Sequence, residues 1–310
     1  MRRFVKVTGS VIGLLVLALA AFYGWASFRS VHLLSQPWEA HRVDIPVPWP
    51  LTPVELADLR AARTAARTAP TALVSMAGAG EPLQAPDPLA DVDIDAIATE
   101  RARERGERLL EARYACVFCH GDDLAGGVMA DDPALGKLLA PNLTMGEGSR
   151  TRDYTTADWD RMVRHGIKPD GSGGVMPSSD FFAMSDQELY DLIVTIRARP
   201  SVDNVVPGVT LGPVGKVLVA TGELPLAASL LPDHQSAHSS TPPSSDDVLA
   251  FGAHLTQICV GCHGIGLSGG PIKGGAPDWP PRPGVDGSMG GLSVANVAAP
   301  GRLHRLRRTA

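Results

Sequence analysis

The chain has little net charge and few aromatic residues. The formal net charge is only −5 over 310 residues, and aromatic residues make up 5% of them. A nearly balanced charge gives no basis for binding nucleic acid or a strongly charged partner. Glycine and proline are instead abundant, with 33 and 26 copies, so loops and linkers are expected to take up much of the chain.

Charged residues are missing altogether from Val7 to Phe28. As a helix this stretch would span about 33 Å, which matches the thickness of a bilayer core. Basic residues precede it and aromatic residues lie at its far end: Arg2, Arg3 and Lys6, then Phe22, Tyr23 and Trp25. The pattern predicts a membrane anchor with a cytoplasmic N-terminus. A signal peptide cleaved after Ala18-Leu19-Ala20 is the alternative, and both interpretations export the chain.

Changes in composition predict five segments. They are an anchor over residues 1–28, an Ala/Pro-rich spacer over 29–99, a compact domain over 100–200, a polar linker over 201–247 and a second, partial domain over 248–310. Apolar periodicity and helix-start signals in the compact domain predict helices over 97–115, 156–165 and 185–199, the last opening with a capping box at Ser185 and Glu188. Long Gly/Pro loops join them, so the predicted fold class is all-α.

Cysteine is also rare, and its arrangement matters more than its number. The four copies form two Cys-x-x-Cys pairs, each followed at once by histidine: Cys116, Cys119 and His120, then Cys259, Cys262 and His263. Both motifs continue as His-Gly-x-x-Leu-x-Gly-Gly, and both are preceded by Gly-x-x-Leu. An internal duplication is the simplest explanation.

The motif Cys-x-x-Cys-His combines covalent attachment and iron ligation. Two thiols at this spacing form thioethers with the two vinyl groups of a haem, and the adjacent imidazole ligates the iron. Zinc would need both pairs to converge over 139 intervening residues and leaves the histidines unexplained. A thioredoxin-like pair needs a βαβ setting that is not indicated here. The sequence therefore predicts two covalent haem c sites, with His120 and His263 as proximal ligands.

The distal ligand of the first haem has several candidates. Met176 stands in the loop Gly-Gly-Val-Met-Pro between two predicted helices, where it can cross the far face of the ring, and thioether sulfur favours Fe(II). Met162 lies on a helix and is more typical of a core residue, and Met184 precedes a helix cap. His165, before Gly166, is more typical of a capping residue. Met176 is the preferred candidate, and the others stay open.

Residues 100–200 resemble the haem module of class I c-type cytochromes, particularly the multihaem cytochrome c subunits of membrane-bound dehydrogenases. The resemblance rests on the attachment motif and on these elements: Gly106, Ala140-Pro-Asn-Leu-Thr144, Tyr154 to Trp159, His165-Gly166, Asp170-Gly171, Met176-Pro177 and the helix 185–199. It implies that Met176 is the distal ligand and that Gly106 lets the first helix pack on the last near Tyr190. It also implies that the Asn142 and Trp159 segments lie along the haem edge.

The second domain departs from this pattern. Only 47 residues follow His263, and none of them is aromatic after Trp279. The Asn-Leu-Thr element, the Trp-bearing helix, the Met-Pro loop and the closing helix are not repeated. We expect a shifted reading frame or misplaced end after about Trp279. The alternatives are a natively short domain with an open or substituted iron site, or a domain completed by a partner. In the short domain Met289 is a poor ligand, and His304 is a candidate distal ligand, although a histidine among four arginines is more typical of a solvated basic tail.

The sequence thus predicts a cytochrome in the bacterial inner membrane with its haem domains in the periplasm. It would carry single electrons from a membrane-bound dehydrogenase or quinol-oxidising complex to a soluble cytochrome or terminal oxidase. No side chain is predicted to act as acid, base or nucleophile, because the cofactor carries the chemistry. Two other functions stay open: a dihaem peroxidase-like enzyme using an open second haem, and a non-catalytic haem sensor or assembly subunit.

Overall fold

The computed structural model describes residues 2–68, 87–231, 233–259, 270–271 and 293–294. The α-helices are α1 (Arg2–Ser35), α2 (Pro53–Thr68), α3 (Ile94–Arg108), α4 (Cys116–His120), α5 (Thr156–His165), α6 (Asp186–Ala198), α7 (Pro213–Thr221), α8 (Ala227–Leu230) and α9 (Val248–Thr256). A π-helical turn, η1 (Leu109–Arg113), follows α3, and 3-10 turns occur at η2 (Ser178–Asp180) and η3 (Gln257–Cys259). The strands are β1 (Gly127–Asp132), β2 (Gly136–Ala140), β3 (Thr210–Leu211), β4 (Gly270–Pro271) and β5 (Ser293–Val294).

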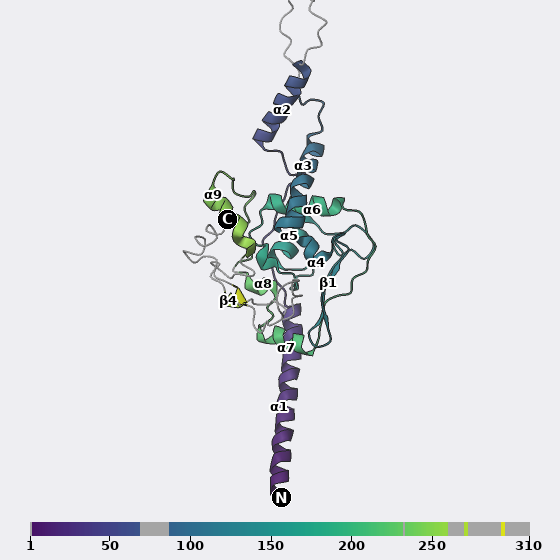
Figure 1. The fold of residues 1–310 in the computed structure, drawn as a ribbon, viewed down its shortest axis with the longest axis vertical. Coiled ribbons are helices and arrows are strands. Elements are labelled where there is room, and N and C mark those ends of the chain that lie inside the picture. Colours follow the sequence, from purple (N-terminus) through teal and green to yellow (C-terminus); the bar gives the residue numbers. More distant parts are fainter. Residues whose placement is uncertain (1, 69–86, 232, 260–269, 272–292, 295–310) are drawn as a thin grey trace, which may run out of the picture.

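Helices α3, α5 and α6 frame the central domain (Figure 1). Capping boxes start two of them, Thr155 with Asp158 at α5 and Ser185 with Glu188 at α6, so unpaired amides of each first turn are satisfied. Gly106 of α3 lies directly against α6, where a Cβ would collide with the backbone of Asp191 and the hydroxyl of Thr195. The predicted close packing of the first helix on the last is therefore confirmed.

The apolar core of this domain draws on more of the chain than the three helices. Its buried members come from α3, η1, α5, α6 and the loops between them, and they include Leu110, Leu124, Leu143, Trp159, Phe181, Leu189 and Ile193. Ile45 and Trp49, 4% and 8% exposed, belong to the same cluster. The range 29–99, interpreted from composition as a spacer, thus supplies core residues to the central domain.

A small sheet adds to the helices. β1 pairs antiparallel with β2, and β2 pairs antiparallel with β3, which gives the order β1-β2-β3. Asp132 accepts hydrogen bonds from the backbone N–H of Ala134 and Leu135 at 2.7 and 2.8 Å, and so forms the turn between β1 and β2. The fold is mainly helical, as predicted, and this sheet is its one addition within the described residues of the domain.

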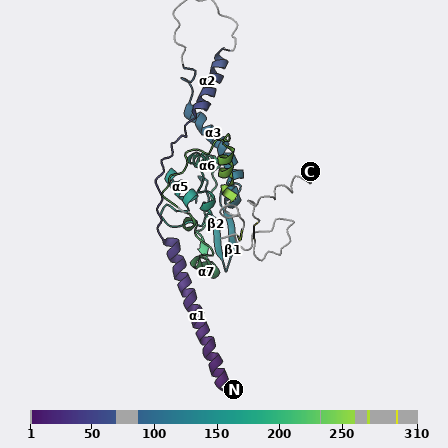
Figure 2. The same ribbon diagram turned by 90° about the vertical axis from the view of Figure 1, so that its left-hand side faces the viewer.

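Helix α1 projects from one end of the domain and α2 from the other, as both views show (Figures 1 and 2). Apolar side chains in the middle of α1 are open to solvent, with Leu14 66%, Leu17 67% and Leu19 68% exposed. By length and composition this is the one described helix able to cross a membrane. Its C-terminal end packs on α7, where the Arg29 Nε donates to the carbonyl of Ala220 at 2.9 Å.

Candidate functional site

The first attachment motif forms the single-turn helix α4. Ala115, immediately before it, has φ 48°, and Gly121, immediately after it, has φ 82°. Left-handed backbone is costly for a residue with a Cβ, so Ala115 breaks the chain sharply between η1 and α4. The two breaks isolate one helical turn, which places Cys116, Cys119 and His120 on neighbouring positions of that turn.

His120 is held in one orientation by the backbone. Its Nδ1 lies 2.8 Å from the carbonyl oxygen of Pro141, and its side chain is 8% exposed. A carbonyl can only accept, so Nδ1 carries the proton and Nε2 keeps its lone pair for a metal. Burial lowers the pKa of His120, against the opposing effect of the Pro141 carbonyl. The imidazole is therefore neutral, as coordination requires.

The two thiols of the motif are also neutral. Burial raises the pKa of Cys116 to about 12 and raises that of Cys119 as well. Two thiols beside an apolar core suit thioether attachment to a macrocycle.

Met176 packs against the same apolar core as Cys116, although it lies far from Cys116 in the sequence. It lies in the loop after α5, where its carbonyl accepts a hydrogen bond from the N–H of Ser178 at 2.8 Å. Met176, Cys116 and Val117 are all partly buried against the central apolar cluster. Met162 and Met184 occupy other positions: Met162 is on α5, and Met184 is 1% exposed within the core. The fold thus brings the predicted attachment motif and the preferred distal ligand to one cluster.

The surroundings fit a haem. The cluster shared by Cys116 and Met176 is lined with aromatic and aliphatic side chains, and the indole Nε1 of Trp159 is buried there without a hydrogen-bond partner among the described residues. A buried hydrogen-bond donor without an acceptor is rare in a folded protein. The carboxylates at the edge of a haem are acceptors for such a bond. Haem c would be held through Cys116 and Cys119, with His120 and Met176 available to the iron.

The loop around Asn142 has a structural role beside His120. Asn142 is fully buried; its amide donates to the carbonyl of Val202 at 2.8 Å, and its Oδ1 accepts from the hydroxyl of Thr144 at 2.8 Å. These bonds fix the segment whose Pro141 carbonyl holds His120. The Ala140-to-Thr144 element therefore holds the Pro141 carbonyl in the place where it accepts the hydrogen bond from His120.

The second attachment motif is described only up to Cys259, which is partly buried. Cys262, His263, Met289 and His304 lie outside the described residues, as does the tail after Trp279 apart from residues 293–294. The approach to this motif contacts the first domain: the Arg113 guanidinium donates to the carbonyl of His254 at 2.9 Å, and His254 Nε2 lies 3.0 Å from Glu188 Oε1. Ile258, next to Cys259, packs on the cluster that also contacts Cys116.

A group of four histidines escaped the sequence interpretation. His41, His165, His234 and His238 lie together on the side of α5. Only His165 stood in a quoted motif, and there it was interpreted as a helix cap. His234 and His238 stand four residues apart in the polar linker and His41 lies far upstream, so no local pattern joins all four.

Comparison with known proteins assigns the central domain to a family. Residues 101–194 match the family described as cytochrome C oxidase, cbb3-type, subunit III. This range contains the second half of α3, the attachment motif, Met176 and most of α6. The resemblance to c-type cytochromes, drawn from the motifs, is confirmed for this part of the chain.

Curated relatives are cytochrome c subunits of dehydrogenases. The chain is 35% identical over 83 residues to the cytochrome c subunit of alcohol dehydrogenase (quinone) from Gluconacetobacter polyoxogenes, and equally to that from Komagataeibacter europaeus. The alignment covers 25% of this chain and 18% of each relative. It is 30% identical over 114 residues to the gluconate 2-dehydrogenase cytochrome c subunit of Pantoea cypripedii, covering 34% of this chain and 25% of that protein. The matched region thus spans a quarter or less of each relative.

Proposed function

We propose that this chain, whose residues 101–194 form a c-type cytochrome domain, is the membrane-attached electron-transfer subunit of a dehydrogenase. The observation that carries the proposal is the fixed imidazole of His120, with Nδ1 bound to the Pro141 carbonyl at 2.8 Å and Nε2 left for iron. The names of the relatives, subunits of quinone-dependent alcohol dehydrogenase and of gluconate 2-dehydrogenase, support a dehydrogenase or quinol-oxidising complex as electron donor. A soluble cytochrome or a terminal oxidase would accept the electrons.

The residues of the domain hold the cofactor and keep its surroundings fixed. Haem c supplies a reversible one-electron couple at iron, and a histidine–methionine ligand pair raises its potential. Cys116 and Cys119 would attach the ring, and His120 and Met176 would ligate the iron. The apolar cluster of Trp159, Phe181 and their neighbours excludes water, so little has to rearrange when the charge on the iron changes. No proton-transfer residue is needed.

The contact between the two repeats supports a relay within the chain. Arg113 lies three residues before Cys116, and it binds the carbonyl of His254, five residues before Cys259. Ile258 and Cys116 pack on one apolar cluster. A haem at each motif would therefore lie close to the other, and an electron could pass from one to the other without diffusion of the protein. This favours two attached haems over one.

Counting covalent haems tests the proposal directly. The exported full-length protein is analysed by intact mass and by pyridine haemochrome absorbance, together with the pairs C116S/C119S and C259S/C262S. We expect two haems in the unaltered chain and one in each variant. One haem in the unaltered chain, lost only in C116S/C119S, would remove the relay and leave the first site. Colourless exported protein would refute the function as a whole.

The distal ligand is tested by replacing Met176 with Ala. Loss of the thioether leaves a five-coordinate or water-bound iron, so we expect the first haem to change from low spin to high spin in its absorption and resonance spectra. M162L and M129A are the matched controls, since Met162 is the rival ligand on α5 and Met129 is 39% exposed on β1. An unchanged low-spin spectrum in M176A, or a high-spin spectrum in M162L, would exclude Met176.

A further inference from the structure

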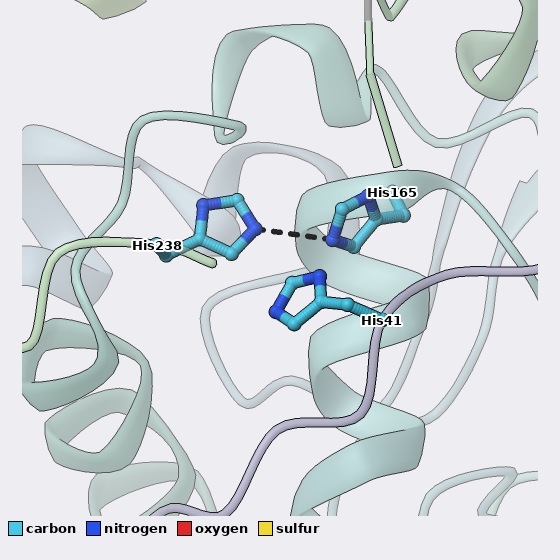
Figure 3. Close-up of side chains that lie close together, drawn as sticks. All are labelled: His41, His165 and His238. Carbon is cyan, nitrogen blue, oxygen red and sulfur yellow. Dashed lines mark hydrogen bonds between the residues drawn. The ribbon is translucent and has the colours of Figure 1, made fainter. Parts of the chain in front are cut away.

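A histidine cluster lies outside the haem site and has no part in the function proposed above. His41 comes from the segment between α1 and α2, His165 from the last turn of α5, and His234 and His238 from the segment between α8 and α9. Figure 3 shows His41, His165 and His238 turned toward one another. Three chain segments far apart in sequence thus place imidazoles in one spot.

The spacing of three of these rings suits a single metal ion. His165 Nε2 and His238 Nε2 are 3.0 Å apart, and one nitrogen from each of His41, His165 and His238 lies within 4.8 Å of the others. Zinc bonds to imidazole nitrogens are about 2.0–2.1 Å long, which puts the ligand nitrogens of a tetrahedral site about 3.3 Å apart. Small rotations of the His41 and His238 rings, which are only partly buried, cover the difference.

The hydrogen bonds of the cluster fix the tautomer of His165 and the orientation of His41, and an ion would replace the bond between the Nε2 atoms of His165 and His238. His234 Nε2 donates to the Ala228 carbonyl at 2.9 Å, so its Nδ1 accepts from His165 Nδ1 at 3.1 Å, and the lone pair of His165 is then on Nε2. His41 Nδ1 donates to the carbonyl of His234 at 3.3 Å. His41 and His165 are each oriented through the nitrogen that faces away from the shared space, which is how metal-binding histidines are usually held.

One facing nitrogen is left without any partner. His41 Nε2 is buried and has no hydrogen bond among the described residues. The carboxylate oxygen Oδ2 of Asp160 is likewise buried and unpartnered, 4.0 Å from His165 Nε2. Buried polar atoms are nearly always satisfied. An acceptor nitrogen and a carboxylate oxygen left open beside the same ring are the atoms that a cation with its bound water would satisfy.

The electrostatic setting also admits a cation. Arg164 is fully buried near the cluster, but it is paired with two carboxylates, Asp160 at 2.6 Å and Asp186 at 2.8 Å. The three groups together carry one negative charge.

We propose that His41, His165 and His238 bind Zn²⁺, with Asp160 beside the fourth position. Three imidazoles without a thiolate suit zinc and exclude the oxygen-seeking ions calcium and magnesium. The ion joins the segment before α2, the C-terminal end of α5 and the linker to the second motif. Gly166, next to His165, accepts from the N–H of Gly174 at 2.7 Å at the base of the Met176 loop. Zinc therefore fastens the two flanking segments to the element that carries this loop.

Zinc content and affinity test this site independently of haem. The exported, haem-loaded, untagged chain is analysed by elemental mass spectrometry, stripped with a chelator and titrated with Zn²⁺ by calorimetry. We expect one zinc per chain, and weakening by more than about 100-fold in H41A and H238A, because loss of even a second-shell partner costs about 10- to 100-fold. H32A is the control, since His32 is exposed on α1 and should leave binding unchanged.

The conservative variants H41Q and H238Q separate ligation from packing. Glutamine keeps a polar side chain of similar length but is a poor zinc ligand. We expect both variants to keep full haem content and the thermal midpoint of the zinc-free protein, and to lose the rise in midpoint that Zn²⁺ gives the unaltered chain. A chain that takes up no zinc, or binds it equally in H41A, H238A and H32A, would show that the histidines form only a hydrogen-bonded cluster. Either result leaves the haem count untouched.

Discussion

Two glycines at matching places in the repeated pattern meet different surroundings. Gly106 and Gly252 each stand three residues before a leucine and ten or seven residues before a Cys-x-x-Cys motif. A Cβ on Gly106 would enter the backbone of Asp191, whereas a Cβ on Gly252 meets nothing within 4 Å among the described residues. Leu109 packs against the core, and Leu255 is 42% exposed. The second repeat keeps the sequence pattern, but within the described part of the chain no helix packs against Gly252.

Alanine at these two positions should therefore have opposite effects. We expect G106A to lower the free energy of unfolding by about 1–3 kcal/mol, the usual cost of overpacking. G252A should leave it unchanged or raise it by up to about 1 kcal/mol, since alanine favours an open helix. Urea unfolding of the haem-loaded protein, followed by far-UV circular dichroism, measures both. Equal midpoints for the two variants would contradict the packing of α3 on α6.

At single residues, local chemistry was predictable and long-range contacts were not. The spacing of Cys116, Cys119 and His120 predicted a one-turn unit, because covalent geometry alone fixes what that motif can reach. The carbonyl that orients His120 belongs to Pro141, and its place depends on Asn142 and the distant Val202. No property of the sequence near His120 specifies that contact.

Elements with explicit end signals were predicted well. The predicted helix over 156–165 matches α5, and that over 185–199 matches α6 to within one residue at either end, because both open with capping boxes. The helix predicted over 97–115 is less regular: α3 begins at Ile94 and gives way at Leu109 to the π-turn η1. Widened turns of this kind often mark functional sites, and this one leads into Cys116.

Strands β1 and β2 were missed for a physical reason. β1 reads Gly-Val-Met-Ala-Asp-Asp and is exposed or half-exposed throughout. A strand without a buried face shows no alternation of apolar and polar residues. Its pairing with β2 depends on the Asp132 turn and on Gly136 at φ 112°, a signal that resembles any other Gly-rich loop.

Helix α9 is fastened to the first domain by His254, and this contact can be tested. His254 is 8% exposed and bonds to Glu188 of α6. We expect H254A to speed amide exchange over residues 248–256 by about 10- to 100-fold, which corresponds to a lost buried hydrogen bond of about 1–3 kcal/mol. L249A is the control, because Leu249 is 86% exposed. Unchanged exchange in H254A would mean that other contacts hold α9.

At the scale of the whole molecule, the sequence predicted the haem module and the apolar N-terminal helix, but not how the segments close around the module. The backbone N–H of Trp38 donates to the Gly171 carbonyl at 2.8 Å, and Ile45 and Trp49 enter the core. The segment has no helical or strand period, so composition alone indicated a spacer. Its place is set by contacts with residues more than a hundred positions away.

Attachment to the membrane through α1 is a further proposal with a direct test. The full chain should stay with the membrane after an alkaline carbonate wash. Replacing residues 1–21 with a cleavable signal peptide should release haem-loaded protein into the soluble periplasmic fraction, because Ala26 and Arg29, which contact the rest of the protein, are kept. A washed-off unaltered chain whose mature N-terminus follows Ala20 would establish the signal peptide instead.

The packing of α1 on α7 has a consequence for how partners meet. Arg29 and Ala220 join the last turns of α1 to the haem-bearing body without an intervening loop. If α1 crosses the bilayer as proposed, the domain cannot move away from the membrane on a flexible linker. The domain rotates only together with α1, and its height above the lipid stays constant. The protein then meets its partners by lateral diffusion and rotation in the plane of the membrane, and a soluble acceptor has to approach the membrane surface.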